Sequence, residues 1–360
     1  MKLTKMIATI GPATWDPEKI VELYKNGINI IRMNFSHKDY EEKERVIALV
    51  RQLNHENKTK LSLLMDNKGP EIRTGKRESK LEIMRGTIFK LWIKQDNMGE
   101  QDLFCDYPYL LEDVVVGDSI KIDSGLLDAK VISIHQEYCE CEALHTAMIG
   151  SYRHINLPGK KLKLPGLTEQ DKEDLLFGIK HAINIVAMSF VRSAEHIREL
   201  RKFWSDNGGG SIHIIAKIEN QEGLDNLIEI IQESDGIMVA RGDLGIEVPI
   251  TLLPMYQEQI IIECHKQGKP VIVATQMIES MIKEPFPTRA EINDIYQAVT
   301  MGADCTMLSG ETAIGSYPIQ ATHFMKQTIQ TAEKNSHRKL IDFSDEGRST
   351  LGLLQKHLVQ

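Results

Sequence analysis

The chain has 360 residues, of which 42% are hydrophobic and 26% are charged, a composition typical of a globular protein of about two domains. It carries 43 basic and 51 acidic side chains, and the net charge of −8 argues against a protein that coats nucleic acid. The N-terminus MKLTKMIATI lacks a signal-peptide core, and no apolar run approaches the length of about 18 residues typical of a membrane span. We therefore expect no membrane association and a cytoplasmic location.

Eight short runs rich in Ile, Val, Leu, Met and Ala recur along the chain, and such runs are typical of strands covered on both faces. The predicted strands are 5–11, 28–36, 60–69, 183–192, 211–220, 236–245, 269–277 and 303–313. Amphipathic helices are predicted at 16–27, 168–182, 193–208, 224–236, 256–268, 288–302 and 318–334. We expect Asp16 to be the N-cap of the first helix, and Thr168 to form a capping box with Asp171.

This alternation of strands and helices predicts an α/β fold, a (β/α)8 TIM barrel. An open doubly wound sheet is the alternative, and it is weakened because no G-x-G-x-x-G sequence follows a predicted strand. Residues 71–156 instead contain β-rich pieces separated by turns, which predicts a small all-β domain inserted after strand 3. The expected domains are barrel parts at 1–70 and 157–335, the inserted domain at 71–156, and a short tail at 336–360.

Five cysteines, at positions 105, 139, 141, 264 and 305, show neither the even count of a disulfide framework nor the spacing of a zinc site. Only Cys139 and Cys141 are close in sequence. We interpret them as two thiols on one face of a strand rather than as a metal site.

Polar residues follow the predicted strands at the ends where barrel enzymes carry their active sites. Lys217 is unusual because it lies inside the apolar run 212–218, where an unpaired charge would be costly. Arg32 and Arg73 end or follow other strands, and together with Lys217 they supply positive charge suited to binding phosphate. We expect these side chains to meet at one rim.

Oxygen ligands for two kinds of cation are found at the same strand ends. Glu219 and Asp243 supply carboxylates that suit Mg²⁺ held jointly with substrate phosphate. Asn34, Ser36 and Asp66 are donors that suit a larger monovalent cation. Cationic side chains and a metal ion around one rim indicate phosphoryl transfer. In that reaction, catalysis consists mostly of positioning the reactants and neutralising their charge.

Each of these residues also has a purely structural interpretation. A single Glu219 or Asp243 would more often be a solvated loop carboxylate, and a single Arg32 could be a structural ion pair. Their joint occurrence at six strand ends favours a functional site.

At these residues the sequence resembles the pyruvate kinases, in the same order from residue 3 to about residue 335. The matching stretches are ATIGPA (8–13), RMNFSH (32–37), DNKGPEIRTG (66–75), NLPG (156–159), AMSFVR (187–192), AKIEN (216–220), VARGDLGIEVP (239–249), ATQMIESM (274–281), PTRAE (287–291) and MLSGETAIGSYP (307–318). The resemblance implies a barrel with a mobile β-domain lid. It also implies phosphoryl transfer from phosphoenolpyruvate to ADP, giving pyruvate and ATP in glycolysis, with Mg²⁺ or Mn²⁺ and K⁺ as cofactors.

The resemblance assigns roles around the substrate. It implies that Lys217 stabilises the migrating phosphoryl group and the enolate, while Arg32 and Arg73 hold phosphate. Thr275 would lie beside the enolate face and influence its protonation. The backbone of Gly242 and Asp243 would contact the substrate carboxylate.

The resemblance also assigns the ions and the nucleotide. Glu219 and Asp243 would bind Mg²⁺. The implied K⁺ ligands are Asn34, Ser36, Asp66 and the carbonyl group of Asn67, and the implied nucleotide contacts are Asn34, His37 and Arg73. Glu71 stands where K⁺-dependent members carry glutamate, which predicts K⁺ dependence.

Several positions depart from the family pattern. Asn67 replaces the usual threonine, Lys38 follows His37 where glycine is usual, and Ser124 stands where a second aspartate is often found. The family also carries a C-terminal domain of roughly a hundred residues, which houses a sugar-phosphate effector site and a subunit interface. We expect no activation by fructose bisphosphate within this chain. The expected partner is a second copy bound through the barrel, or a separate chain that supplies that domain.

Two other functions remain as alternatives. Another Mg²⁺-dependent barrel enzyme acting on phosphoenolpyruvate or pyruvate, an aldolase or a decarboxylase, would share the carboxylates but need neither the K⁺ ligands nor the inserted domain. A non-catalytic paralogue that binds a ligand would be favoured by loss of Lys217, Glu219, Asp243 or Thr275, and all four are present.

Overall fold

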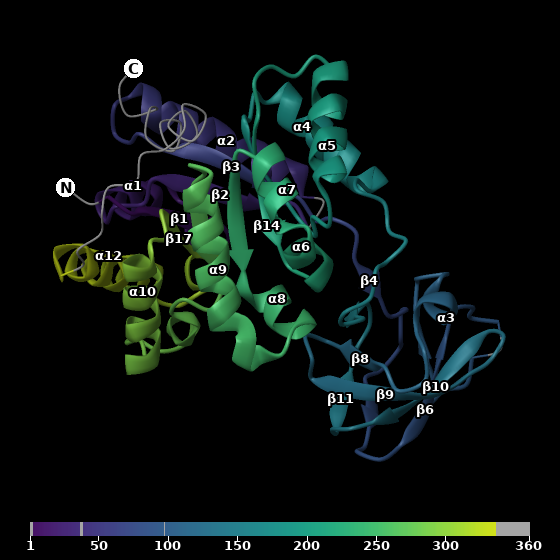
Figure 1. Ribbon diagram of the computed structural model, residues 1–360. Helices are drawn as coiled ribbons and strands as arrows, with labels where there is room; N and C mark the ends of the chain where they lie inside the picture. The colour runs from purple at the N-terminus through teal and green to yellow at the C-terminus, as the bar shows by residue number, and fades with distance from the viewer. Residues whose placement is uncertain (1–2, 37–38, 97, 336–360) are drawn as a thin grey trace.

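The barrel consists of eight parallel strands that close in the order β1-β17-β16-β15-β14-β13-β3-β2 in the computed structural model, which describes residues 3–36, 39–96 and 98–335 (Figure 1). The strands are β1 (Lys5–Thr9), β2 (Ile30–Asn34), β3 (Ser62–Asp66), β13 (Ile185–Met188), β14 (His213–Ile218), β15 (Gly236–Ala240), β16 (Val271–Ala274) and β17 (Cys305–Leu308). Each strand lies within one of the predicted runs, so the predicted (β/α)8 barrel is confirmed and the open sheet is excluded.

Helices connect these strands and cover the outside of the barrel (Figure 1). They are α1 (Pro17–Lys25), α2 (Tyr40–His55), α4 (Glu169–Lys180), α5 (Ala194–Asp206), α6 (Gln221–Asp225), α7 (Leu227–Glu233), α8 (Arg241–Glu247), α9 (Leu253–Lys266), α10 (Arg289–Met301), α11 (Gly310–Ala313) and α12 (Pro318–Asn335), with 3-10 turns η1 (Ile250–Leu252) and η2 (Glu279–Ile282). The sequence prediction did not delimit α2, and it assigned the residues of α8 and α11 to the ends of strands or to the loops after them. Along the described chain, no helix combines the length and the hydropathy that crossing a bilayer requires.

The two predicted helix caps have different outcomes. Thr168 and Asp171 form a complete capping box at the start of α4, as predicted. Asp16 occupies the N-cap position of α1, but its side chain makes no capping hydrogen bond. Instead it lies 3.9 Å from Lys19 in an exposed ion pair.

A buried carboxyl group on α4 makes the stability of this part of the barrel pH-dependent. Burial raises the pKa of Asp174 to about 6, although hydrogen bonds from Tyr40 and Gln170 oppose the rise. Because the folded state holds this proton more tightly than the unfolded state, Asp174 costs stability as the pH rises from about 4 to about 6. In urea titrations, Asp174→Asn should therefore gain stability relative to the wild type across that window. Parallel curves of unfolding free energy against pH would contradict this.

The inserted region forms a separate β-structure beside the barrel, at the lower right of Figure 1. Its seven-stranded sheet has the order β4 (Ile72–Arg73), β12 (His154–Asn156), β8 (Ser119–Ile122), β9 (Leu127–Ile134), β10 (Tyr138–Ala143), β6 (Ile88–Trp92) and β7 (Leu103–Phe104). A second sheet pairs β5 (Leu81–Ile83) with β11 (Ala147–Ile149), and α3 (Leu110–Asp113) is a single helical turn. These strands enclose their own apolar core, which confirms an inserted β-domain after the third barrel strand.

The cysteines agree with the sequence interpretation. All five are buried and free. The sulfur atoms of Cys139 and Cys141 lie 3.7 Å apart on β10, inside the core of the inserted domain. They therefore share one face of a strand, as the spacing predicted.

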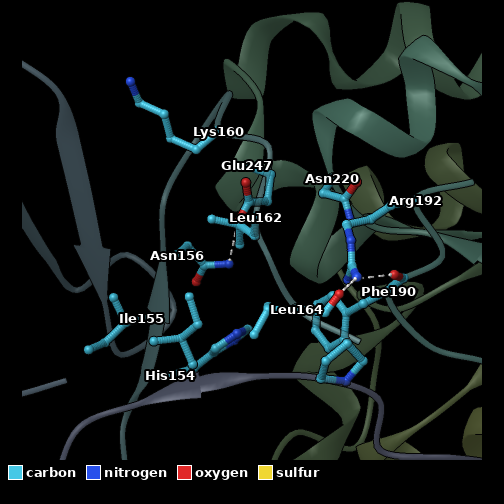
Figure 2. A pocket seen from close by; sticks show the side chains of 12 residues that line it. His154, Ile155, Asn156, Lys160, Leu162, Leu164, Phe190, Arg192, Asn220 and Glu247 are labelled. Carbon is cyan, nitrogen blue, oxygen red and sulfur yellow. Dashed lines mark hydrogen bonds between the residues drawn. The ribbon is translucent and has the colours of Figure 1, made fainter. Parts of the chain in front are cut away.

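The inserted domain touches the barrel beside a narrow pocket, which Figure 2 shows. Asn156 on β12 donates a hydrogen bond to Glu247 at the end of α8, with Nδ2 and Oε1 separated by 2.7 Å. The rings of His154 and Phe190 meet edge to face with centroids 5.6 Å apart. The two parts of the chain are therefore connected by side chains as well as by backbone.

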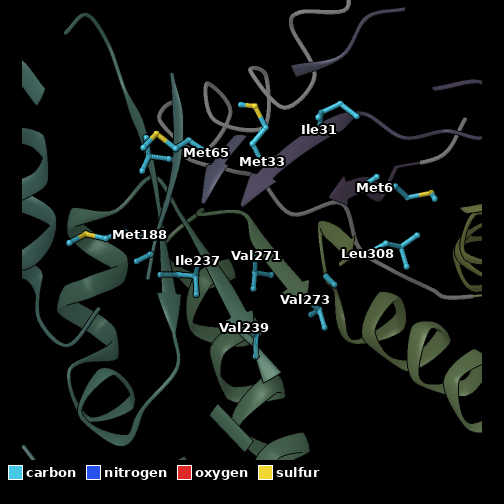
Figure 3. Packing of buried hydrophobic residues seen from close by; sticks show 14 of the residues in the cluster. Met6, Ile31, Met33, Met65, Met188, Ile237, Val239, Val271, Val273 and Leu308 are labelled. Atoms are coloured by element: carbon cyan, nitrogen blue, oxygen red, sulfur yellow. The ribbon is translucent and has the colours of Figure 1, made fainter. Parts of the chain in front are cut away.

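Apolar side chains pack on both faces of the barrel strands. One set fills the barrel interior, and it includes Ile30 on β2 and Ile215 on β14. The residues that follow them, Ile31 and Ala216, belong to the larger layer between strands and helices, part of which Figure 3 shows. This alternation fixes which side chains point into the barrel, and it positions the polar residues at the strand ends.

Candidate active site

Polar side chains form the last layer of the barrel interior, at the carboxyl ends of the strands. Five interior core residues are each followed two positions later by a polar residue: Ile7 by Thr9, Ile30 by Arg32, Leu64 by Asp66, Ala187 by Ser189, and Ile215 by Lys217. Because side chains two apart on a strand share a face, these polar groups also point inward. The strand register places Thr9 opposite Arg32, and it places Asp66 one inward-facing position further along, opposite Asn34 and Ala187.

Lys217 is the centre of this layer. Its side chain is only 11% exposed, and its ammonium lies 3.1 Å from Asp66 Oδ1 and 3.0 Å from Glu219 Oε1. It also donates a hydrogen bond of 2.7 Å to Ser189 Oγ. The lysine inside the apolar run is therefore paired on several sides at the carboxyl ends of the strands.

The buried charges hold one another in ionised form. Burial alone would lower the pKa of Lys217, but Asp66 and Glu219 outweigh burial and raise it above its ordinary value. Burial alone would raise the pKa of Asp66, yet Arg32 and Lys217 hold it below its ordinary value. Arg32 contributes a 2.6 Å contact from Nε to Asp66 Oδ2 and donates to Thr9 Oγ1 at 2.9 Å.

Among the described residues, Glu219 pairs with one cation, Lys217, whereas Asp66 pairs with two. Burial, with a smaller contribution from the charge of Asp243, raises the pKa of Glu219 to about 7 against the opposing effect of Lys217. Oε2 accepts a 2.7 Å hydrogen bond from the Phe190 backbone. Oε1 is buried and accepts no hydrogen bond within the described part of the chain, although it is paired with the Lys217 ammonium. This oxygen is therefore available for a further ligand.

Ser189 and Asp171 are part of the site, and the sequence analysis gave them no role in it. The Ser189 hydroxyl donates to the carbonyl of Asn67 at 2.7 Å and accepts from Lys217. The Asn67 side chain accepts from the Ser189 backbone and donates to Asp171, which also binds the N–H group of Gly69. The Asn67 side chain therefore links the end of β3 to Ser189 after β13 and to Asp171 on α4. Nothing local in the sequence signals these contacts, because each of them joins segments far apart in the chain.

The segment of Gly242 and Asp243 lies opposite, in the first turn of α8. The Gly242 N–H group donates a 2.7 Å hydrogen bond to Thr275 Oγ1. Asp243 interacts electrostatically with Glu219 and Lys217, since its charge contributes to the pKa shift of each. Asp243 is therefore electrostatically coupled to the Lys217 cluster, and Thr275 is joined by a hydrogen bond to the residue that precedes Asp243.

Thr275 is held in an unfavourable backbone conformation. Its φ is 66° and that of Gln276 is 53°, in the left-handed region that non-glycine residues seldom adopt. The buried guanidinium of Arg241 donates to the carbonyl oxygens of both residues, at 2.7 and 3.2 Å, and pairs with Asp294 at 2.7 Å. Arg241, to which the sequence analysis gave no role, therefore holds the turn that presents the Thr275 hydroxyl.

Other predicted residues lie outside this cluster. Arg73 pairs with Glu71, with a 2.8 Å hydrogen bond from Nε to Oε2, and among the described residues it has no ion pair with the Lys217 cluster. Asn34 is opposite Asp66 in the strand register, and its Oδ1 accepts from the Ser36 backbone at 3.0 Å. His37 and Lys38 lie outside the described residues.

Fold and site together define a (β/α)8-barrel protein with a cluster of buried charged side chains at the carboxyl ends of its strands, where barrel enzymes carry their active sites. A family model described as "Pyruvate kinase, barrel domain" matches residues 1–322. The chain is 45% identical over 336 residues to a pyruvate kinase of Clostridium acetobutylicum, covering 92% of this chain and 71% of that protein. It is 41% identical over 342 residues to one of Geobacillus stearothermophilus, covering 94% of this chain and 58% of that protein.

A solved structure gives the same result. The crystal structure of a pyruvate kinase from Cryptosporidium parvum superposes with a TM-score of 0.89 at 37% identity, covering 93% of this chain and 70% of that one. The chain belongs to the pyruvate kinase family. It spans 71% of the length of the first of these curated relatives and 58% of the length of the second.

Proposed function

We propose that this protein transfers the phosphoryl group of phosphoenolpyruvate to ADP, giving pyruvate and ATP. The observation that carries the proposal is the buried ammonium of Lys217, which three neighbouring side chains hold at the mouth of the barrel. Phosphoryl transfer needs fixed positive charge where negative charge moves between oxygens. Lys217 provides it beside the migrating phosphoryl group and the enolate oxygen, and Arg32 holds the phosphate.

We propose that Thr275 lies beside the enolate face and influences its protonation. The Gly242–Asp243 backbone faces the substrate carboxylate. The hydrogen bond between Gly242 and Thr275 supports this assignment, because it holds the two proposed substrate contacts next to each other.

The carboxylates of Glu219 and Asp243 suit a divalent ion. Within the described ranges no three His, Cys, Asp or Glu side chains are arranged to hold a metal by themselves. Mg²⁺ is commonly bound by one or two protein carboxylates, and oxygens of the substrate phosphate complete its coordination. The buried Oε1 of Glu219, which is paired with Lys217 but accepts no hydrogen bond within the described residues, fits this role, and the ion would supply charge neutralisation for the phosphate.

For K⁺, the proposed ligands are Asn34, Ser36, Asp66 and the carbonyl oxygen of Asn67. They fit a hard monovalent cation because all are oxygen donors, and strand register puts Asn34 opposite Asp66. Activity should therefore require K⁺ and fall strongly when Na⁺ replaces it at constant ionic strength. Full activity in Na⁺ alone, measured as pyruvate formation, would refute the K⁺ assignment.

The nucleotide contacts are assigned to Asn34, His37 and Arg73. Arg73 supports this assignment because it lies on β4, where the inserted domain joins the barrel. We propose residues 71–156 as the bounds of that domain, between barrel parts 1–70 and 157–335. The absence of fructose-bisphosphate activation, the cytoplasmic location and the partner bound through the barrel remain predictions from the sequence.

The function is tested by mixing the purified chain with phosphoenolpyruvate, ADP, Mg²⁺ and K⁺ and following pyruvate. We expect pyruvate that depends on every one of these components. A correctly folded protein that binds phosphoenolpyruvate without turnover would instead indicate a non-catalytic member of the family.

A further inference from the structure

A pair of hydrogen bonds seats the inserted domain on the last turn of α8. Asn156 Nδ2 donates to Glu247 Oε1 at 2.7 Å, and Lys121 Nζ donates to the carbonyl oxygen of Ile246 at 2.7 Å. Lys121 and Asn156 are direct partners across β8 and β12. Directly opposite residues in an antiparallel pair share a face of the sheet. Lys121 and Asn156 therefore lie side by side and donate to two consecutive residues of α8.

The contact is buried enough to be specific. Asn156 is 3% exposed, and its Oδ1 has no hydrogen-bond partner within the described residues. Within the described residues, the bond from Nδ2 to Glu247 is therefore the side-chain hydrogen bond that orients this amide. Burial raises the pKa of Glu247 to about 7, which agrees with a carboxyl group enclosed between the two domains.

Helix α8 connects this contact to the candidate active site. It has only seven residues, with Gly242 and Asp243 in its first turn and Glu247 at its end. Four residues of helix correspond to about 6 Å along the axis. Any shift of the inserted domain that acts through Glu247 therefore acts on the same short rigid element that carries Asp243.

We propose that Glu247 is a positioning residue, which together with the Lys121–Ile246 bond sets the orientation of the inserted domain over the barrel mouth. Its side chain does not contact the proposed reactants. It holds the inserted domain, which carries the proposed nucleotide contact Arg73, at a defined place relative to Asp243. The kinetic part of this inference rests on the proposed function, but the structural part does not.

The test measures the distance between the two domains directly. Spin labels at Glu82→Cys on β5 and Glu258→Cys on α9, both exposed positions, report the separation by pulsed electron paramagnetic resonance. All native cysteines are buried, which limits background labelling. Two variants are compared in the doubly labelled protein. Glu247→Ala removes the hydrogen-bond acceptor, and Glu247→Gln keeps an acceptor oxygen. The double variant Asn156→Asp/Glu247→Gln restores the bond with donor and acceptor exchanged.

We expect Glu247→Ala to shift the distance distribution towards a second separation, changing the ratio of the two populations by about tenfold. Glu247→Gln and the double variant should keep the wild-type distribution. In active protein, Glu247→Ala should raise the KM for ADP by a similar factor while kcat changes less. A distribution for Glu247→Ala identical to that of Glu247→Gln would overturn the proposal, whether or not the protein turns over phosphoenolpyruvate.

A second comparison serves if Glu247→Ala does not fold. Lys121→Met removes the other bond, and Lys130→Met is its matched control because Lys130 is an exposed lysine on the adjacent strand β9. Only Lys121→Met should shift the distance distribution. Equal distributions for the two lysine variants would overturn the proposal as well.

Discussion

Replacing Lys217 by methionine should lower the turnover of phosphoenolpyruvate by at least about 10³-fold, the size of effect seen when a cation that neutralises a migrating phosphoryl group is removed. Methionine keeps the length and the apolar packing of the side chain and removes only the ammonium. That ammonium lies 3.0 Å from Glu219 and 3.1 Å from Asp66. Steady-state kinetics at saturating substrate, metal and K⁺ measures the change.

The control for this variant is Lys130→Met, an exposed lysine in the inserted domain, which should retain the wild-type rate. Far-ultraviolet circular dichroism should show that Lys217→Met remains folded, because Arg32 still compensates Asp66. A folded Lys217→Met protein within a factor of ten of the wild-type rate would show that the ammonium does not act on the reacting groups.

Asp66→Asn should have the largest effect on stability. The carboxylate of Asp66 is buried between Arg32 and Lys217 and contacts both. Removing its charge leaves two buried cations with one carboxylate fewer, and breaking a buried pair in this way costs about 3–5 kcal/mol. Urea denaturation should show a fall of that size in the free energy of unfolding.

An exposed ion pair provides the comparison. Lys202 and Asp206 lie 2.7 Å apart on α5 with side chains 76% and 58% exposed. Asp206→Asn should change the free energy of unfolding by less than about 1 kcal/mol, because solvent screens such pairs. Similar losses for Asp66→Asn and Asp206→Asn would mean that the Asp66 carboxylate does not compensate the two buried cations.

The barrel was predictable because its strands are nearly continuous apolar runs and its helices have clear stop signals. Lys217 was identifiable for a related reason, since a charge inside such a run must be paired. The boundary between β15 and α8 was not predictable in this way. Its first residues, Arg241 to Asp243, continue directly from β15 without a separating loop, so the pattern suggested a longer strand.

Other parts of the site depend on contacts between segments far apart in the chain. Ser189 is 28 residues from Lys217 in sequence and 122 from Asn67, and only the closed barrel brings the three together. The left-handed backbone of Thr275 and Gln276 has no signal either, because neither residue is glycine. The guanidinium of Arg241 holds that turn, but the sequence does not distinguish this residue from other arginines, because only the structure shows that it is buried.

In the proposed reaction, groups from separate strand ends act together on one migrating phosphoryl group. Phosphorus NMR of the purified protein with phosphoenolpyruvate, ADP, Mg²⁺ and K⁺ tests it most directly. The phosphoenolpyruvate signal should decay while the γ-phosphate signal of ATP grows at the same rate. Release of inorganic phosphate instead of ATP, or an unchanged spectrum from folded protein, would contradict it.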